Sequence, residues 1–297
     1  MTRPDVAGRM CGIGDEAAAG IDGQVAAQRQ AGMRAVEIRT IDGRGIHQLT
    51  DRQVAAAAEA IADAGLVVPV VDTPIGGWAV TVRSNLDAEL AVLRRAAIRA
   101  RAFGCRRLRV MSYPNDGRAE RGWRAEALVR MNVLTSAAED LGVVLLHENC
   151  QGWASRSPDQ TLEMLFDVNS PYLRLIFDIG NGLSYGYEAP AFLKAVLPWV
   201  DHVHVKDGLR TGAAGRPVYT LPGAGEAGLA VCIDMLERHG YRGWYSIEPG
   251  LAFMPHQQID GGPEAKAGFY RLYAEAFEQM LTALASDADD TRSKVLI

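Results

Sequence analysis

The sequence predicts an α/β protein of one domain, folded as a closed (β/α)8 barrel of the TIM type. Short Val-, Ile- and Leu-rich runs alternate with longer Ala-rich stretches along the chain, and eight such runs can be counted. The runs are continuously apolar, as expected for parallel strands that are covered on both faces. Eight strands, each followed by a helix, are the elements of this barrel, and 297 residues are enough to form it.

The eight strand candidates occur in the order that the barrel requires. They are residues 9–14, 35–40, 66–72, 107–113, 143–149, 173–181, 201–207 and 243–249. A doubly wound open sheet is the competing fold. After the first strand, however, Gly12 and Gly14 lack the third glycine of a GxGxxG phosphate turn. The barrel is therefore the better prediction.

The stretches between the strands have helical spacing and helix boundary signals. The clearest are residues 21–32, 86–105, 127–142 and 228–240. The first has an aspartate near its start, and a glycine closes the first, third and fourth. In the second stretch, the apolar residues expected close to one face are Leu86, Leu90, Leu93 and Ile98.

The last helix is expected over about 263–286, against the outside of the barrel. The residues after it are polar and should form a loose tail. No linker divides the chain. We therefore expect one barrel domain over residues 1–286, followed by a polar C-terminal tail over residues 287–297.

Composition excludes several classes of partner. A net charge of -5 and an isoelectric point near 5.7 argue against affinity for nucleic acid or a membrane surface. The four cysteines form no CxxC pair, which is typical of reduced thiols in the cytosol. The N-terminal residues have no apolar signal core, and the chain has no apolar run of 18 residues. A cytoplasmic protein is expected.

Ligand-type residues end each of the last four predicted strands. They are Glu148, Asp178, His204 and Glu248. Catalytic groups of such barrels lie at the carboxyl ends of the strands. One such residue alone is more often a turn former, but four in succession are not explained in that way. Three buried carboxylates on one rim need a cation, so the sequence predicts one divalent metal ion, with Mn, Mg or Co favoured and Zn also suitable.

The run DHVHVKD carries five ionisable residues on a strand that should be buried. His202 shares a face with His204 but lies deeper, so we expect a hydrogen-bonded core histidine. Lys206, one of only four lysines, should lie near the rim. Either it binds a substrate oxygen, or it pairs with Asp207 or Glu37. A Schiff-base role is redundant beside a metal.

Other residues are expected near the mouth of the barrel. Glu37 and Arg39 end the second strand and are placed to enter the pocket, with polar filling of the rim as the alternative. His147 should point away from the metal, because it precedes a proposed ligand. Trp153 is expected to be a packing anchor, although stacking on a sugar ring is the alternative reading.

Two long connections follow the last two strands, over residues 211–225 and 250–262. Loops of this length over a barrel mouth indicate a lid or a partner-facing surface, and His256 is placed to reach a substrate from there. The sequence has no cluster of Arg or Lys that marks a phosphate site. A phosphorylated substrate is therefore not indicated.

The motifs HEN, FDIGN, HVHVKD, PGAGEAG and SIEPG occur in this order between residues 145 and 250. In this order they resemble the xylose-isomerase-like TIM barrels, the sugar and sugar-phosphate isomerase/epimerase family. The resemblance implies that Glu148, Asp178, His204 and Glu248 hold the metal. In the ketose 3-epimerases of this family, two metal-bound glutamates move a proton on opposite sides of the substrate. Those positions correspond to Glu148 and Glu248.

The resemblance also has gaps. Arg210 matches an arginine that the epimerases carry six residues after the metal histidine. Asn181 stands where they have a histidine, and Ala154 stands where they have a second glutamate. Asn181 resembles the DPGN form of inosose-converting members, with Ile179 in place of the proline. The substrate-binding residues expected from all these observations are Arg210, Lys206, Asn181, Glu37 and His256.

The resulting prediction is a metal-dependent isomerase or epimerase of a sugar, keto-sugar or cyclitol, acting by proton abstraction next to a metal-bound carbonyl. The alternative is an inosose-type dehydratase, a lyase that uses the same abstraction. A DNA-repair endonuclease fits badly, because it would need a histidine-rich multi-zinc site and a basic groove. A non-catalytic sugar-binding barrel would be expected to lack a ligand. The resemblance implies a homodimer or homotetramer.

Overall fold

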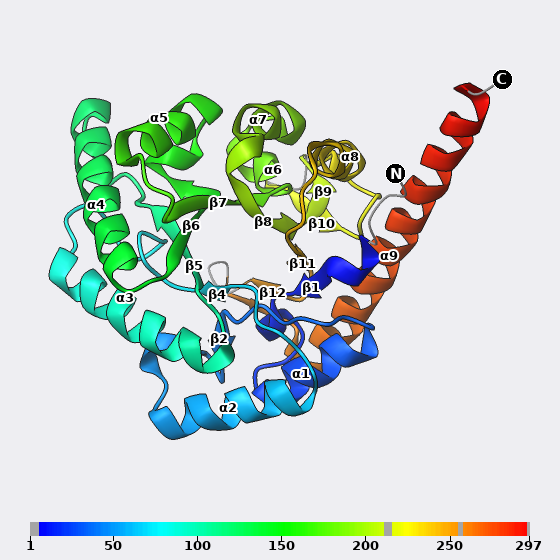
Figure 1. Ribbon diagram of the computed structural model, residues 1–297, viewed down its shortest axis with the longest axis horizontal. Coiled ribbons are helices and arrows are strands. Elements are labelled where there is room, and N and C mark those ends of the chain that lie inside the picture. The colour runs from blue at the N-terminus through cyan, green and yellow to red at the C-terminus, as the bar shows by residue number, and fades with distance from the viewer. Residues whose placement is uncertain (1–5, 211–215, 255–257, 296–297) are drawn as a thin grey trace.

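The computed structural model describes residues 6–210, 216–254 and 258–295, and it confirms the predicted barrel. The parallel strands are β1 Met10–Gly12, β4 Val71–Asp72, β5 Arg107–Ser112, β6 Val144–Gly152, β7 Leu173–Asp178, β8 Val200–Val205 and β11 Tyr245–Ile247. They form one sheet in the order β1-β11-β8-β7-β6-β5-β4. Figure 1 shows the strands at the centre of the molecule with the helices around them.

The ring closes through residues 35–38, part of the second predicted strand. This segment lies between β1 and β4 and makes isolated parallel bridges to both. One bridge joins Ile13 to Glu37, and another joins Ile38 to Val71. Backbone hydrogen bonds on each side support these bridges. A short and irregular eighth strand therefore completes the barrel.

The helices cover the outer face of the barrel. They are α1 Ile21–Gln30, α2 Asp51–Asp63, α3 Leu86–Ala100, α4 Glu120–Asp140, α5 Pro158–Val168, α6 Asn181–Tyr185, α7 Ala189–Val196, α8 Leu229–His239 and α9 Gly262–Val295. Side chains of Thr50, Asn85 and Ser157 accept backbone N–H groups at the starts of α2, α3 and α5. Such caps satisfy donors that a helix start leaves without a partner, and they fix where each helix begins.

Two expectations about the helices are wrong. The last helix was expected to end near residue 286, but α9 continues to Val295, so most of the expected loose tail is helical. The division of the chain into residues 1–286 and 287–297 stays a prediction. Ile98 is 62% exposed, whereas Leu93 is fully buried. The reason is that position 98 lies about 120° around the helix from Leu86.

Alternation along the strands decides what fills the barrel interior. Val70, Leu146 and Ile176 form a small apolar cluster there, separate from the large core between strands and helices. Because side chains two residues apart share a face of a strand, Glu148 and Asp178 follow Leu146 and Ile176 on the inner face. The apolar layer is thus the floor on which the polar residues of the carboxyl ends lie.

Three short hairpins follow strands of the ring. They are β2 Thr40–Ile41 with β3 Arg44–Gly45, β9 Asp207–Leu209 with β10 Val218–Thr220, and β12 Phe253–Met254 with β13 Ile259–Asp260. Since each follows a barrel strand directly, all three belong to the face where the strands end. Among the described residues, we find no helix with the length and apolar character that crossing a bilayer requires.

The buried carboxylate of Asp207 holds the loop that follows β10. One oxygen, Oδ1, accepts the backbone N–H groups of Gly208 and Ala227 at 2.9 and 3.2 Å. The other, Oδ2, accepts those of Gly223 and Gly225 at 2.8 and 3.2 Å. Four backbone donors therefore depend on one side chain, which gives the PGAGEAG motif a structural role.

Candidate metal centre and active site

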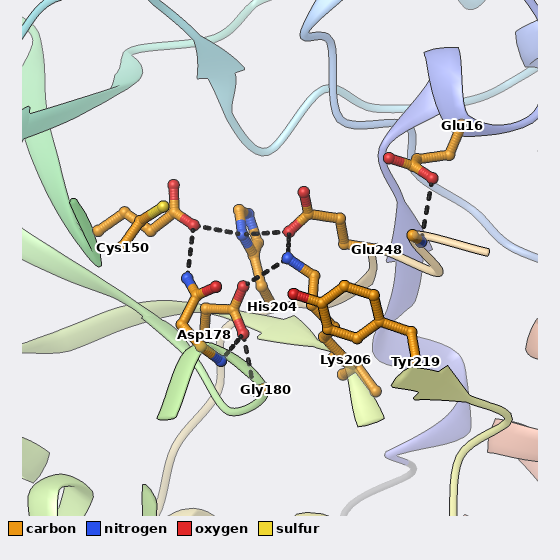
Figure 2. Close-up of polar contacts among 12 residues, drawn as sticks. Glu16, Cys150, Asp178, Gly180, His204, Lys206, Tyr219 and Glu248 are labelled. Atoms are coloured by element: carbon orange, nitrogen blue, oxygen red, sulfur yellow. Dashed lines mark hydrogen bonds and ion pairs between the residues drawn. The ribbon is translucent and has the colours of Figure 1, made fainter. Parts of the chain in front are cut away.

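Four ligand-type side chains meet at the carboxyl ends of the strands. They are Glu148, Asp178, His204 and Glu248, all predicted from the sequence, and each offers one ligand atom within 4.8 Å of the others. Figure 2 shows Asp178, His204 and Glu248 pointing toward one another, with Lys206 among them. The arrangement brings three carboxylates and one imidazole to one point inside the barrel mouth.

The register of the parallel strands explains why these residues meet. Asp178 at the end of β7 lies directly opposite His204 on β8. His204 in turn lies opposite Ser246 on β11, two residues before Glu248. Residues that face inward at the same height of adjacent strands become neighbours. The strand register therefore pairs Asp178 with His204, and Glu248 follows on the same face as Ser246, two residues beyond the partner of His204.

His204 is oriented by Glu37. The Nε2 atom of His204 lies 3.0 Å from Oε1 of Glu37, and Nε2 of His202 lies 2.8 Å from Oε2. Because an ionised carboxylate only accepts hydrogen bonds, both imidazoles carry their hydrogen on Nε2. The Nδ1 atom of His204 is then left facing the carboxylates, 3.6 Å from Oε1 of Glu148 and 3.6 Å from Oε2 of Glu248.

The two glutamates are held in matching ways. Glu148 directs Oε1 toward His204, and its Oε2 accepts from Arg109 at 3.1 Å. Glu248 directs Oε2 toward His204, and its Oε1 accepts from Arg39 at 3.1 Å. Each glutamate therefore has one oxygen at the centre of the cluster and the other on an arginine.

The two arginines are themselves paired with further acids. Arg109 also lies 3.1 Å from Oδ2 of Asp72. Arg39 also pairs with Asp15 and Glu16, at 2.8 and 2.7 Å. These buried pairs leave neither guanidinium without a counter-charge. They fix the arginines so that the glutamate side chains in turn have one preferred orientation.

Lys206 lies inside the cluster rather than on its rim. Its Nζ is 3.1 Å from Oδ2 of Asp178 and 2.7 Å from Oε2 of Glu248. Its Nζ is also 5.7 Å from the centre of the Tyr219 ring. Of the two readings that the sequence left open, the ion pair is therefore observed, with different partners from those expected.

Asparagines complete the support around the acids. The Nδ2 of Asn181 donates to Oε1 of Glu148 at 3.2 Å. The side chain of Asn149 bonds both the N–H and the carbonyl of Asp178, at 2.7 and 2.9 Å. Oδ1 of Asp178 accepts the N–H groups of Gly180 and Asn181 at 2.7 and 3.0 Å. The carboxylates of Glu148 and Asp178 are thus oriented by neutral donors as well as by charges.

The surroundings set the protonation of the acids in opposite directions. Burial acts to raise the pKa of Glu148, but Arg109 and His204 outweigh it and hold that pKa below its ordinary value. Burial also acts to raise the pKa of Glu248. Lys206 and His204 outweigh burial and hold that pKa well below its usual range. Burial raises the pKa of Asp178 to about 6, against the effect of Lys206. Both glutamates are therefore ionised near neutral pH.

A cavity of about 640 Å3 opens above the cluster. Its lining residues are Arg39, Trp78, Arg109, Met111, Glu148, Cys150, Asn181, Ser184, Tyr185, Lys206, Arg216, Pro217, Tyr219, Glu248 and Gln258. The volume lies within the range of small-molecule sites. Two of the predicted substrate-binding residues, Lys206 and Asn181, line it.

Two other predicted substrate-binding residues do not. Glu37 is fully buried beneath the cluster, where it orients His204. Arg210 donates to the carbonyls of Gly182 and Tyr187 and pairs with Glu188, which directs its guanidinium away from the cavity. His256 lies outside the described residues. For Glu37 and Arg210, the geometry corrects the expectation.

Three predictions about neighbouring residues are confirmed. His202 is a buried, hydrogen-bonded histidine. His147 is fully buried away from the cluster, with Nε2 3.4 Å from the hydroxyl of Ser155. Trp153 is a packing residue that is 1% exposed and donates to Glu120.

The sequence prediction missed Arg109, and it left Arg39 open between entering the pocket and filling the rim. One signal could have identified Arg109: it is a charged residue within an apolar strand. It lies two positions after Arg107 and therefore on the same face of that strand. Since Arg39, Arg109 and Lys206 converge on the cavity, the basic residues do form a cluster in space. Each is paired with a carboxylate, so the cluster balances the acids of the site.

The donor set fits a divalent cation. The Nδ1 atom of His204 is buried without a hydrogen-bond partner among the described residues. Its distances of 3.6 Å to both glutamates are too long for hydrogen bonds. An unpartnered imidazole nitrogen that faces carboxylate oxygens is typical of ligands that share one ion, with Glu37 as the supporting carboxylate behind the imidazole.

Comparison with known proteins agrees with the barrel fold. The sequence pattern of the xylose isomerase-like TIM barrels matches residues 25–268. A solved structure of a xylose isomerase domain protein from Planctomyces limnophilus aligns with a TM-score of 0.70 and 19% identity, over 95% of this chain and 98% of that one. That likeness supports the fold.

Two curated relatives match over shorter regions. Inosose dehydratase 1 of Bacillus cereus is 28% identical over 138 residues, which is 40% of this chain and 46% of the relative. A 2-epi-5-epi-valiolone 7-phosphate 2-epimerase of Actinoplanes sp. is 31% identical over 141 residues, 46% of this chain and 48% of the relative. The chain thus spans about half the length of the curated relatives it matches.

Proposed function

The chain belongs to the xylose isomerase-like TIM barrel family, and we propose that it is a divalent-metal-dependent isomerase or epimerase of a sugar, keto-sugar or cyclitol. The observation that most supports this function is the meeting of three carboxylates and one imidazole within 4.8 Å. Two of those carboxylates are glutamates on either side of the imidazole. The relatives named as an epimerase and a dehydratase support proton transfer at carbon as the common step.

Four residues would hold the metal ion: Glu148, Asp178, His204 and Glu248. When bound, the ion supplies a Lewis acid that polarises a carbonyl and acidifies the neighbouring C–H bond. Three hard carboxylate oxygens and one imidazole favour manganese, magnesium or cobalt, and zinc also accepts this set.

Glu148 and Glu248 are the proposed acid and base. One takes the proton from the carbon next to the carbonyl, and the electron pair of the broken C–H bond moves to the carbonyl oxygen. The other glutamate takes up a proton from solvent once the substrate is bound and delivers it to the opposite face of that carbon as the electron pair returns from the oxygen, which inverts the carbon. The first glutamate then releases its proton to solvent. Both carboxylates are ionised before the substrate binds, because Arg109 and Lys206 lower their pKa values.

Lys206 and Asn181 are the proposed substrate contacts on the floor of the cavity. The ammonium group of Lys206 lies between two acids and can offset charge that develops on a substrate oxygen. Asn181 fixes one oxygen of Glu148, so it also limits where the reacting carbon can lie. Neither residue needs to leave its present contacts to border the cavity.

A dehydratase is the second candidate, favoured by the match to inosose dehydratase. It begins with the same removal of a proton. The electron pair then expels the hydroxyl group on the next carbon, which leaves as water after it receives the proton from the protonated glutamate. Loss of water from the product distinguishes this reaction from epimerisation, which leaves the mass unchanged.

The test is turnover of a panel of ketoses and inososes in heavy water by the manganese-loaded protein. Deuterium should enter the carbon next to the carbonyl, and mass spectrometry of the product distinguishes epimerisation from dehydration. Glu148→Gln and Glu248→Gln should each abolish net turnover, because the amide cannot accept the proton. Glu188→Gln, which changes a side chain that is 71% exposed, is the matched control and should keep full turnover.

Metal content is measured in every preparation, so that loss of the ion and loss of the base are separated. Turnover without solvent deuterium in the product would point to a hydride shift and would remove the acid and base roles of the two glutamates. No turnover of any panel member would contradict the proposal itself.

The cellular setting is proposed to be the cytoplasm. All four cysteines are free and buried, which fits a reducing compartment. Assembly into a homodimer or homotetramer is proposed from the family resemblance, and size-exclusion chromatography with light scattering tests it.

A further inference from the structure

The cavity has two parts of different character. Its floor consists of buried ionic and polar residues, among them Arg109, Glu148, Asn181 and Lys206. Its outer wall is formed by Trp78, Tyr185, Ser184, Arg216, Pro217, Tyr219 and Gln258. Trp78 is 45% exposed and Tyr185 is 37% exposed, so the wall borders solvent. The proposed chemistry uses only the floor.

The cavity is larger than one sugar ring requires. A hexose or cyclitol has about twelve non-hydrogen atoms, and at the roughly 30 Å3 that a water molecule takes in the liquid these would fill at most about 360 Å3. The cavity volume is about 640 Å3. Room for a second ring therefore remains when the floor is filled.

The chemistry of the wall matches a second sugar ring. Three aromatic side chains, Trp78, Tyr185 and Tyr219, can pack against the apolar C–H face of a pyranose. Arg216 and Gln258 lie beside them and can hydrogen-bond to hydroxyl groups. An apolar ligand would leave those polar groups unused, and a simple anion would leave the aromatic ones unused.

The part of the wall that carries Trp78 is firmly anchored. The buried carboxylate of Glu89 accepts the N–H of Gly76 at 3.1 Å, the hydroxyl of Tyr113 at 3.0 Å and Arg130 at 2.9 Å. Gly76 has φ of +66°, and a Cβ there would lie 2.1 Å from the carbonyl oxygen of Met111. The loop is thus fixed two residues before Trp78, so its position requires little ordering when a ligand binds.

We infer that the substrate of this site is a glycoside, whose keto-sugar or cyclitol ring reacts on the floor while a second glycosyl ring lies against the wall. The inference rests on the proposed function, and it names the substrate class of the same site. Trp78 is a specificity residue in this arrangement and takes no part in proton transfer.

The test compares matched probes with the manganese-loaded protein. One pair is D-fructose and isomaltulose, which is fructose carrying a glucosyl group. The other is 3-keto-glucose and 3-keto-cellobiose, in which the keto ring carries a glucose. The value of kcat/KM for solvent deuterium exchange should be at least tenfold higher for the disaccharide in one pair. Equal or faster exchange of the free rings would overturn the inference and leave the proposed function intact.

Variants then test the wall. In Trp78→Ala the ratio of the two kcat/KM values should fall about tenfold, because one aromatic contact contributes about 1.4 kcal/mol. Trp78→Phe should restore most of that ratio. Phe166→Ala removes another aromatic residue, 65% exposed on α5 and away from the cavity lining, and should leave the ratio unchanged. An unaltered ratio in Trp78→Ala would overturn the role of the wall.

If no probe exchanges, the proposed function fails, and binding alone tests the inference. Isothermal titration with 3-keto-cellobiose should then give a Kd about tenfold weaker for Trp78→Ala than for the unchanged protein. Equal Kd values, or no detectable binding by either, would overturn the inference as well.

Discussion

Glu37 and His204 form a buried hydrogen bond of 3.0 Å between elements that lie far apart in the sequence. Both side chains are fully buried. The bond places the hydrogen of His204 on Nε2 and leaves Nδ1 toward the carboxylates. A carboxylate behind a ligand imidazole fixes the ring and strengthens it as a donor. The residue expected to touch substrate therefore acts one layer deeper.

Replacing Glu37 should weaken metal binding. We expect Glu37→Gln to raise the Kd for Mn2+ by about 10- to 100-fold, since the amide cannot hold both imidazoles as acceptor. Competition with a chromophoric chelator measures the Kd. His202→Gln leaves the hydrogen bond between Glu37 and His204 in place, so it should change the Kd for Mn2+ much less. An unchanged Kd in Glu37→Gln would show that His204 needs no support from this carboxylate.

Arg109 should matter for stability far more than Arg210. Arg109→Met leaves the buried acids Asp72 and Glu148 without their counter-charge, and we expect a loss of about 3–5 kcal/mol in the free energy of unfolding. Arg210→Met removes a half-buried pair and should cost at most about 1 kcal/mol. Urea unfolding in the presence of chelator compares the two. Similar losses in both would contradict the buried pairing described for Arg109.

Asp207 should be more important to folding than a typical strand-end acid. In Asp207→Asn only one oxygen remains, so two of the four backbone N–H groups lose their acceptor whichever way the amide turns. We expect a loss of about 2 kcal/mol or more. Asp201→Asn, whose side chain is 28% exposed, is the matched control and should lose at most about 1 kcal/mol. Thermal unfolding measures the stability of both variants. Equal losses of stability in the two would mean that the loop does not depend on Asp207.

Acid should destabilise the protein partly through His147. Burial lowers the pKa of this imidazole from 6.5 to about 4. As pH falls from 6.5 to 4, the unfolded chain binds a proton that the folded chain does not, so stability is lost with falling pH. The loss reaches about 3 kcal/mol.

His147→Gln should therefore show a shallower decline in the free energy of unfolding over that interval. Urea titrations at several pH values, with chelator throughout, measure both slopes. Parallel slopes for the variant and the unchanged protein would mean that His147 does not contribute.

The sequence was sufficient for residues whose role depends on strand position. Glu148, Asp178, His204 and Glu248 end successive strands, and a parallel barrel brings such ends together whatever the loops do. Their meeting required only the correct fold. Their roles as ligands and bases stay predictions.

The sequence was insufficient where a side chain could reach more than one partner. Arg210 lies at the spacing expected of a substrate contact, yet nearby carbonyls of Gly182 and Tyr187 attract its guanidinium. Lys206 could have paired with Asp207 or Glu37, but Asp178 and Glu248 lie closer. For a long flexible side chain, differences in distance of about an ångström decide which acceptor it contacts. The periodic pattern of a sequence does not contain that information.

The irregular eighth strand of the ring affects when, during folding, the site becomes able to bind the proposed ion. Residues 35–38 are joined to their neighbours by isolated bridges, and Glu37 is one of them. Until this segment docks, His204 has no carboxylate behind it and can turn to present either nitrogen. Closure of the barrel and readiness to bind the proposed ion are therefore one event, so we expect a partly folded chain with its other seven strands in place not to hold that ion in the way proposed.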